Sequence, residues 1–195
     1  MTHDAQQAAP LGAWQVLAER VLVDAAPWVR LTSEHVRLPN GVEIPDFYRV
    51  EMPPFAAIFA LTPAREVLMV EHYRHGPRQV SLELPAGYIE GEDTPLNAAQ
   101  RELREETGHT SADWQALGAF FIDGNRGCGA VHAFLAREAL AVQAPHLENT
   151  ELLHLHRLPV DQVLGRWGAG DFPNVVTLAV VGRALYQLGL LGKSA

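Results

Sequence analysis

GYIEGEDTPLNAAQRELREETG, from Gly87 to Gly108, combines a glycine-containing loop with the best-defined helix of the chain. Thr94 can cap the first turn of this helix, and Pro95 suits its first position. Gly108 can end it in a left-handed conformation. An apolar stripe at helical spacing predicts one buried face, formed by Leu96, Ala99 and Leu103. The charged residues are therefore expected on a different face.

Three glutamates of this helix, Glu102, Glu105 and Glu106, are spaced i, i+3 and i+4, so their carboxylates can converge near one side. Mg²⁺ or Mn²⁺ prefers such oxygen ligands, and substrate phosphates normally complete the coordination. Arg101 and Arg104 can neutralise or orient the acids. Taken alone, three glutamates on a helix more often form a solvated acidic face, so the flanking residues must decide between the two interpretations.

The formal net charge of −8 argues against a general nucleic-acid binder, because phosphate backbones recruit patches of Lys and Arg. Most of this charge lies between Ser81 and His109, where seven acidic residues accompany two arginines. Divalent cations bound there would reverse the local electrostatics. A substrate that contains phosphate is therefore compatible with the composition.

The spacing from Gly87 to Gly108 resembles the Nudix box, the loop-helix-loop motif of a family of metal-dependent hydrolases that cut diphosphate linkages. Two positions depart from the pattern: Asp93 stands where the family has Glu, and His109 takes a position usually given to an aliphatic or small residue. Neither position is a principal metal ligand of the family. The resemblance therefore implies a hydrolase with Mg²⁺ or Mn²⁺ as its cofactor.

The resemblance also implies roles for individual residues of the box. Glu102 and Glu106 correspond to the main metal ligands, and Glu105 to a further ligand with a catalytic part. Arg101 corresponds to an orienting partner in catalysis, and the carbonyl of Ala86 to another metal contact.

Two further segments, 82–87 and 71–75, look like the branch of the family that contains ADP-ribose pyrophosphatases and nucleoside diphosphate sugar hydrolases. In that branch Arg74 would contact a substrate phosphate, whereas the residues alone allow equally a buried or paired structural arginine. Glu83 is either an acid of the substrate site or an ordinary strand residue. Arg126, in a glycine-rich loop, is a third candidate for substrate binding, although a loop arginine is more commonly just exposed.

The same branch usually supplies a catalytic carboxylate from a loop before a late strand. Glu151 fits this position best, and Glu148 is the reserve candidate. Such a residue would deprotonate the water that attacks phosphorus. Without the family, two glutamates in a polar loop are most often simply solvated.

The remaining sequence predicts an α+β fold. Apolar and polar residues alternate over 15–50 with Asn40-Gly41 between two runs, which indicates an antiparallel sheet with a hairpin. We expect further strands at 55–61, 66–72, 81–85, 114–122, 130–136 and 152–158, and helices after Val160 and over 175–191. The resemblance implies a Nudix-type α/β/α sandwich with a mixed central sheet beside the N-terminal antiparallel sheet.

We expect residues 1–52 to form an N-terminal tail and a sheet for dimerisation, and residues 53–195 to form the Nudix domain. In the resembling branch this arrangement gives a homodimer whose subunits share substrate sites. No apolar run approaches the ~20 residues needed to cross a bilayer, and the start does not read as a secretion signal. The single Cys128 excludes an internal disulfide, which agrees with a reducing cytoplasm. The charge and the short apolar runs lead us to expect no nucleic-acid and no membrane partner.

The expected activity is hydrolysis of a nucleoside diphosphate sugar. ADP-ribose, cut to AMP and ribose 5-phosphate, is the favoured substrate. The loop 124–129 lacks the proline that ADP-ribose enzymes commonly carry, so other nucleoside diphosphate derivatives stay open. A non-catalytic, nucleotide-binding Nudix domain is the alternative, and the intact acidic helix favours catalysis.

Overall fold

The computed structural model describes residues 11–147 and 149–192 and divides into two compact units. Unit 1 contains the described residues up to Pro53 together with Asp123–Gly129. Unit 2 contains Pro54–Ile122 and the described residues from Ala130 onward. Within the described ranges, no helix is both long and apolar enough to cross a membrane.

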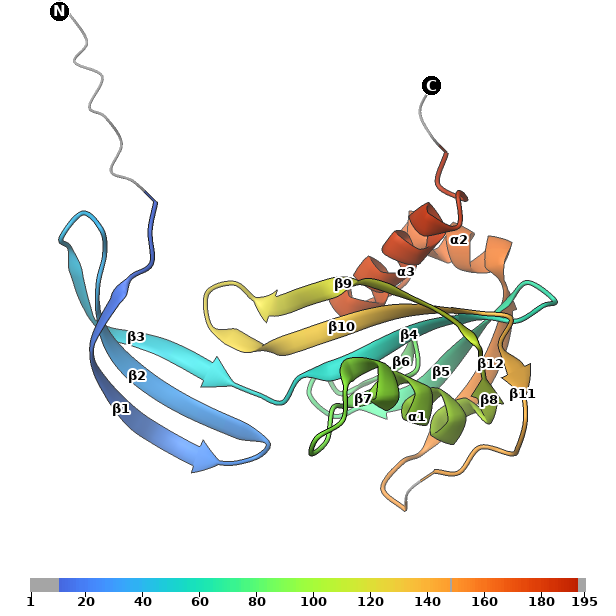
Figure 1. The fold of residues 1–195 in the computed structure, drawn as a ribbon, viewed down its shortest axis with the longest axis horizontal. Coiled ribbons are helices and arrows are strands. Elements are labelled where there is room, and N and C mark those ends of the chain that lie inside the picture. The colour runs from blue at the N-terminus through green and yellow to red at the C-terminus, as the bar shows by residue number, and fades with distance from the viewer. Residues whose placement is uncertain (1–10, 148, 193–195) are drawn as a thin grey trace, which may run out of the picture. The chain divides into compact units, whose positions relative to one another are not determined.

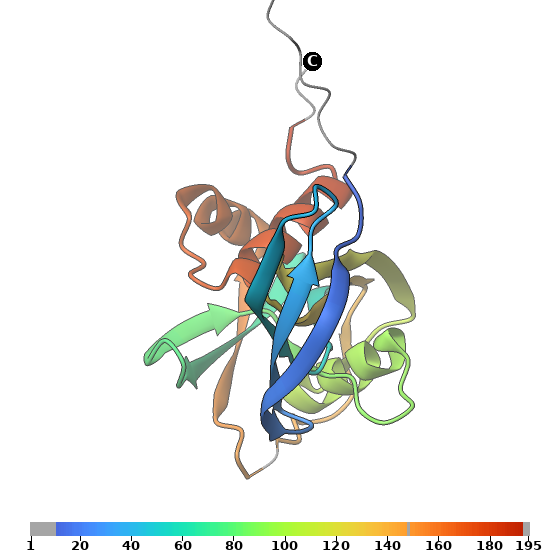
Figure 2. The same ribbon diagram turned by 90° about the vertical axis from the view of Figure 1, so that its left-hand side faces the viewer.

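Unit 1 is built on three consecutive antiparallel strands, β1 (Gln15–Ala25), β2 (Val29–Arg37) and β3 (Glu43–Glu51), which lie side by side in Figure 2. The β2–β3 connection turns at Asn40-Gly41, where Gly41 adopts a φ of +85°. A residue with a side chain rarely adopts this conformation, whereas glycine does so at little cost. The predicted N-terminal hairpin is therefore confirmed.

Unit 2 contains a mixed sheet. Strand β4 (Phe55–Leu61) pairs in parallel with β10 (Gly127–Arg137) and antiparallel with β5 (Glu66–Arg74). On its far side β5 pairs antiparallel with β12 (Leu153–Pro159). Because both faces of β4 are covered, its sequence reads as a continuous apolar run rather than an alternating one.

Shorter or flanking strands complete unit 2: β6 (Gln79–Glu83) on β5, β7 (Ala86–Tyr88) on β4, β9 (Asp113–Asp123) on β10, and a separate pair of β8 (His109–Thr110) with β11 (Leu140–Ala141). Strand β6 begins and ends two residues earlier than the segment 81–85 that the sequence predicts. Pro85 has no N–H to donate to a ladder, and its carbonyl instead accepts from Ile58 N at 2.9 Å.

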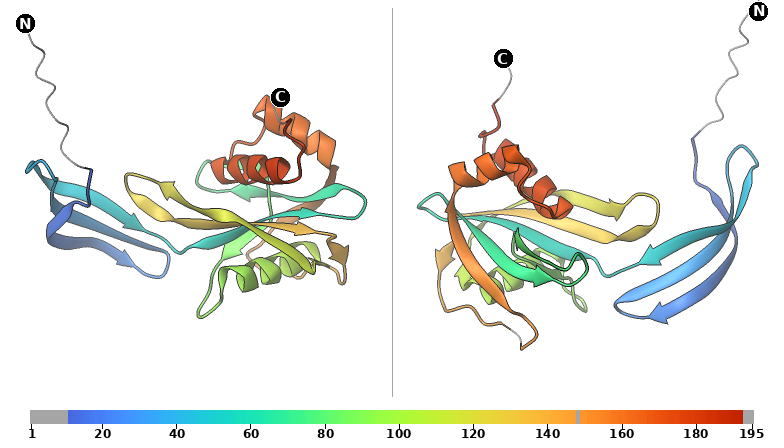
Figure 3. Two further views of the ribbon diagram at one scale, coloured as in Figure 1. Left: turned by 45° about the horizontal axis from the view of Figure 1, so that its top comes forward. Right: turned by 180° about the vertical axis from the view of Figure 1, so that it is seen from behind.

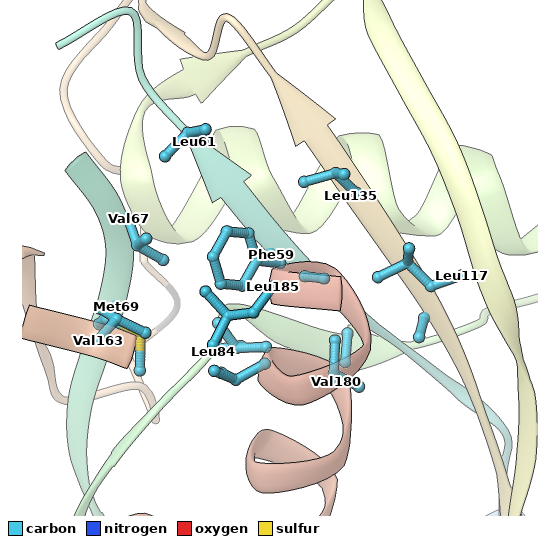
Figure 4. Packing of buried hydrophobic residues seen from close by; sticks show 14 of the residues in the cluster. Phe59, Leu61, Val67, Met69, Leu84, Leu117, Leu135, Val163, Val180 and Leu185 are labelled. Carbon is cyan, nitrogen blue, oxygen red and sulfur yellow. The ribbon is translucent and has the colours of Figure 1, made fainter. Parts of the chain in front are cut away.

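Helices cover both faces of this sheet. Helix α1 (Pro95–Thr107) lies against one face, and α2 (Val160–Ala169) and α3 (Val175–Gln187) lie against the other (Figures 1 and 3). Successive residues of β4 pack on opposite faces of the sheet, into two hydrophobic clusters. Ile58 belongs to the cluster that contains α1, whereas Phe59 belongs to the cluster that contains α3 (Figure 4). The predicted α+β, Nudix-type sandwich with a mixed sheet is confirmed.

Helix α1 has the bounds that its caps predict. Thr94 Oγ1 accepts a hydrogen bond from Asn97 N at 3.2 Å, and Gly108, at a φ of +72°, donates its N–H to Arg104 O. Helix α3 ends at Gln187, earlier than the predicted residue 191. Its last turn closes through Leu188 N and Ala184 O, and Gly189 then turns left-handed with a φ of +70°.

The contact between α2 and α3 leads to a stability prediction for Gly182. Trp167 Nε1 donates to Leu178 O at 2.9 Å, and a Cβ added to Gly182 would lie 2.8 Å from this nitrogen. Gly182→Ala should displace the indole and lower the free energy of unfolding by about 1–3 kcal/mol in urea denaturation. Gly165→Ala is the control, because its Cβ meets nothing within 4 Å and alanine favours the helix. Equal loss in both variants would contradict the proposed clash.

Candidate functional site

The candidate site lies where α1 meets the backbone of β7. Glu102 and Glu106, one turn apart on α1, are both buried, with exposed fractions of 7% and 5%. Ala86 N donates to Glu106 Oε2 at 3.0 Å. A Cβ on Gly87 would lie 2.0 Å from Glu102 Cδ. The glycine therefore leaves the space that the Glu102 carboxylate occupies.

Arg101 holds the acidic groups of this site together. Its Nη1 donates to Glu102 Oε1 at 2.7 Å and to Glu105 Oε2 at 3.2 Å, while Nη2 donates to Tyr88 O at 2.9 Å. Its Nε also lies 3.6 Å from Asp93 Oδ2. The shorter acid at position 93 is thus still within ion-pair distance of Arg101. These contacts place Arg101 where an orienting partner would lie.

The electrostatics of the two buried glutamates disfavour negative charge in the absence of a cation. Burial, with the charge of Glu102 as a further cause, raises the pKa of Glu106 to about 8 despite the Ala86 N–H. Burial also raises the pKa of Glu102, although Arg101 opposes this shift. Because both buried carboxyl groups have raised pKa values, a cation next to them would stabilise their ionised forms.

The residues fit a hard divalent cation. Carboxylate oxygens are the donors that Mg²⁺ prefers, and both raised pKa values would fall beside a positive ion. Among the described residues, no group of three or more His, Cys, Asp or Glu side chains forms a ready metal site by itself. Substrate oxygens or water would therefore have to complete the coordination.

Glu151 lies within electrostatic range of both buried glutamates, and its charge adds to the raised pKa of Glu102 and of Glu106. The loop before β12 therefore brings this candidate base to the site, although it is distant in sequence from α1. Glu148, the reserve candidate, lies outside the described residues.

Arg74 and Glu83 form a close ion pair next to this centre. Arg74 Nη2 and Nε donate to Glu83 Oε2 at 2.8 and 3.2 Å, and Glu83 is only 3% exposed. The charge of Arg74 also lowers the pKa of Glu106 slightly, so Arg74 lies within electrostatic range of this carboxyl group. Arg74 is thus paired, as the structural alternative expects, and is also placed near the acidic centre.

Sequence reasoning did not identify Asn174 as a further member of this network. Its Nδ2 donates to the same Glu83 Oε2 at 2.8 Å. Burial alone would raise the pKa of Glu83, but His72, Arg74 and Asn174 together hold it well below its usual range. In the sequence, Asn174 stands directly before a predicted helix. This position indicates a helix cap but gives no sign of the hydrogen bond to Glu83.

Arg126 lies in unit 1, in the turn between β9 and β10. Its side chain is 60% exposed and pairs with Asp123, with Nη1 3.3 Å from Oδ2. This is the geometry of an ordinary loop arginine. A substrate contact by Arg126 stays a prediction.

His109, which departs from the family pattern, leads to a pH prediction. The ring is buried, with Nδ1 2.6 Å from Thr107 O and Nε2 3.4 Å from Arg157 Nη2. Burial and the charge of Arg157 lower the pKa of His109 below 6.5. Its contribution to stability is therefore present above the unfolded-state pKa and is lost as pH falls below it. The melting temperature of His109→Val should fall less than that of the wild type between pH 7 and 5, and parallel profiles would contradict this assignment.

Comparison with known proteins agrees with this geometry. The model of the NUDIX domain matches residues 52–176, and the model of the nucleoside diphosphate sugar hydrolase N-terminal domain matches residues 14–50. An ADP-ribose pyrophosphatase of Bacillus subtilis is 30% identical over 137 residues, 70% of this chain and 74% of that protein. A methanol dehydrogenase activator of Bacillus methanolicus is 31% identical over the same shares.

A solved structure, described as the crystal structure of an ADP compounds hydrolase, superimposes with a TM-score of 0.80. It covers 93% of this chain and 99% of that chain at 17% identity, and so it bears on the fold alone. The domain match spans most of the chain and includes the acidic helix, β7 and the Arg74–Glu83 pair. The chain therefore belongs to the Nudix family and is a pyrophosphate hydrolase.

Proposed function

We propose that this protein is a Mg²⁺- or Mn²⁺-dependent hydrolase of nucleoside diphosphate sugars, with ADP-ribose as the favoured substrate and AMP and ribose 5-phosphate as products. The observation that carries the proposal is the buried pair Glu102 and Glu106 against the backbone of Ala86 and Gly87. The match of residues 14–50 to the sugar hydrolase N-terminal domain and the pyrophosphatase relative support the substrate class.

In the proposed reaction, Glu102, Glu105, Glu106 and the backbone of Ala86 hold the cation. When bound, the cation neutralises charge on the diphosphate oxygens and makes an attacking water more acidic. Glu151 accepts the proton of this water.

Two arginines have distinct parts in the same proposal. Arg74, next to the acidic centre, binds a phosphate oxygen of the substrate, because a guanidinium offers fixed donors in one plane. Arg101 keeps the carboxylates of Glu102 and Glu105 in orientation. Neither arginine has to gain or lose a proton.

The test is a panel of diphosphates incubated with the wild-type protein. ADP-ribose, other nucleoside diphosphate sugars, dinucleoside polyphosphates and nucleoside triphosphates would each be supplied with Mg²⁺, Mn²⁺ or EDTA, and a coupled phosphatase would report the monophosphate products. We expect turnover of ADP-ribose with a divalent cation and none with EDTA. Preference for another sugar nucleotide would correct the substrate alone. Binding of a nucleotide without turnover of any compound would favour the non-catalytic alternative.

We also propose that unit 1 forms a homodimer interface. The strands of unit 1 and the residues next to them expose many large apolar side chains, which a partner would cover. Those more than one third exposed are Trp14, Val16, Val21, Leu22, Val23, Trp28, Val42 and Tyr48. A second copy is the natural partner on the analogy of the resembling branch. Light scattering should give twice the mass of the 21.4 kDa chain, and a monomer would refute this part of the proposal.

A further inference from the structure

Asn174 uses both ends of its side-chain amide. Its Oδ1 accepts hydrogen bonds from Val176 N at 2.9 Å and Thr177 N at 3.4 Å, which caps the first turn of α3. Its Nδ2 donates to Glu83 Oε2 at 2.8 Å. The beginning of α3 is therefore tied directly to a carboxylate at the end of β6.

The carboxylate that Asn174 holds is the one that binds Arg74. Both Arg74 donors and the Asn174 amide converge on a single atom, Glu83 Oε2. All three residues line one cavity of about 410 Å³. Because Glu83 is almost completely buried, rotation of its carboxylate would cost hydrogen bonds to both partners at once.

We propose that Asn174 is a positioning residue for diphosphate binding, which acts on Arg74 through Glu83. The inference rests on the proposed function, in which Arg74 contacts a phosphate of the substrate. An arginine that is already held in its binding orientation loses less conformational freedom when the anion arrives. Asn174 thus sets the affinity for the diphosphate without touching it.

The chemistry of position 174 is specific. Serine or aspartate can cap the helix equally well, but serine lacks the amide donor and aspartate brings a second carboxylate against Glu83. These two substitutions therefore separate the helix cap from the bridge, the hydrogen bond from Asn174 Nδ2 to Glu83 Oε2. Asn174→Ser removes only the bridge, and Asn174→Asp replaces it with repulsion.

The experiment is a double-mutant cycle between Asn174→Ser and Arg74→Ala, with steady-state kinetics on the best diphosphate substrate. We expect Asn174→Ser to raise KM about tenfold, the effect of one hydrogen bond to a charged group, with a smaller change in kcat. In the Arg74→Ala background the same substitution should have no further effect, because the residue through which it acts is gone. Asn174→Asp should raise KM more than Asn174→Ser does.

Val175→Gly is the matched control, since it weakens the same helix end at a 65% exposed position without contacting Glu83. It should lower the melting temperature and leave KM unchanged. Additive effects in the cycle, or a KM for Val175→Gly that rises as much as for Asn174→Ser, would overturn the positioning role while the proposed function stands. A wild-type protein that neither hydrolyses any diphosphate nor binds ADP-ribose in calorimetry would overturn both.

Discussion

Glu106→Gln should lower kcat on a diphosphate substrate by about 10²–10³-fold, the equivalent of several kcal/mol of lost charge stabilisation by the cation. The fold should persist, because the glutamine carbonyl can accept the hydrogen bond that Ala86 N now donates to Glu106 Oε2. What disappears is the negative charge that a cation requires. Glu102→Gln should behave in the same way, since Glu102 is the other buried acid of the pair.

A second measurement on Glu106→Gln does not depend on activity. Burial raises the pKa of Glu106 in the folded protein to about 8 from the 4.5 of an ordinary glutamate. Its stabilising effect is therefore complete below pH 4.5 and is lost as pH rises through 8. Glutamine cannot ionise, so in EDTA the variant should melt at a higher temperature than the wild type at pH 9. At pH 5 the two should differ little.

Glu138→Gln serves as the control, because it makes the same chemical change at an exposed position of unit 2. It should keep both the activity and the pH profile of the wild type. If Glu106→Gln also keeps full activity, α1 is not the catalytic centre.

Gly87→Ala should also abolish most activity, with a fall in kcat/KM of about 10²-fold or more when a metal ligand is displaced. The added Cβ would lie 2.0 Å from both Cδ and Oε1 of Glu102. The carboxylate must therefore leave its position or push β7 away from α1. Either movement separates Glu102 from the backbone of Ala86, where the cation is proposed to bind.

A higher Mg²⁺ concentration at half-maximal activity for Gly87→Ala than for the wild type would be the most direct sign of this displacement. Gly168→Ala is the control, since a Cβ there meets nothing within 4 Å in α2. It should leave activity and metal dependence unchanged. Normal kinetics for Gly87→Ala would show that the position of the Glu102 carboxylate has no part in the reaction.

Local signals predicted much of the fold. Caps fixed the bounds of α1 because Thr94, Pro95 and Gly108 each act on the residues next to them. Asn40-Gly41 marked the hairpin for the same reason. The end of α3 was harder to predict, because its apolar pattern continues beyond Gln187, whereas the helix ends there and Gly189 turns left-handed.

The site was predictable where its members share one helix and depended on the family elsewhere. Helical spacing alone places Glu102 beside Glu106. The approach of Glu151 depends on the path of the chain after β11, which no local pattern records. Asn174 was missed because its contact with Glu83 spans 91 residues and arises only when α3 packs next to β6.

At the proposed site, a cation would have to replace Arg101 as the positive partner of Glu102 and Glu105. The Arg101 guanidinium already supplies a positive partner to Glu102 and Glu105. A cation at the proposed site would compete with this internal positive charge, so part of its attraction to the carboxylates would be offset by the loss of their ion pairs with Arg101. Under this proposal Arg101 would limit the affinity of the site for a cation as well as orient its carboxylates.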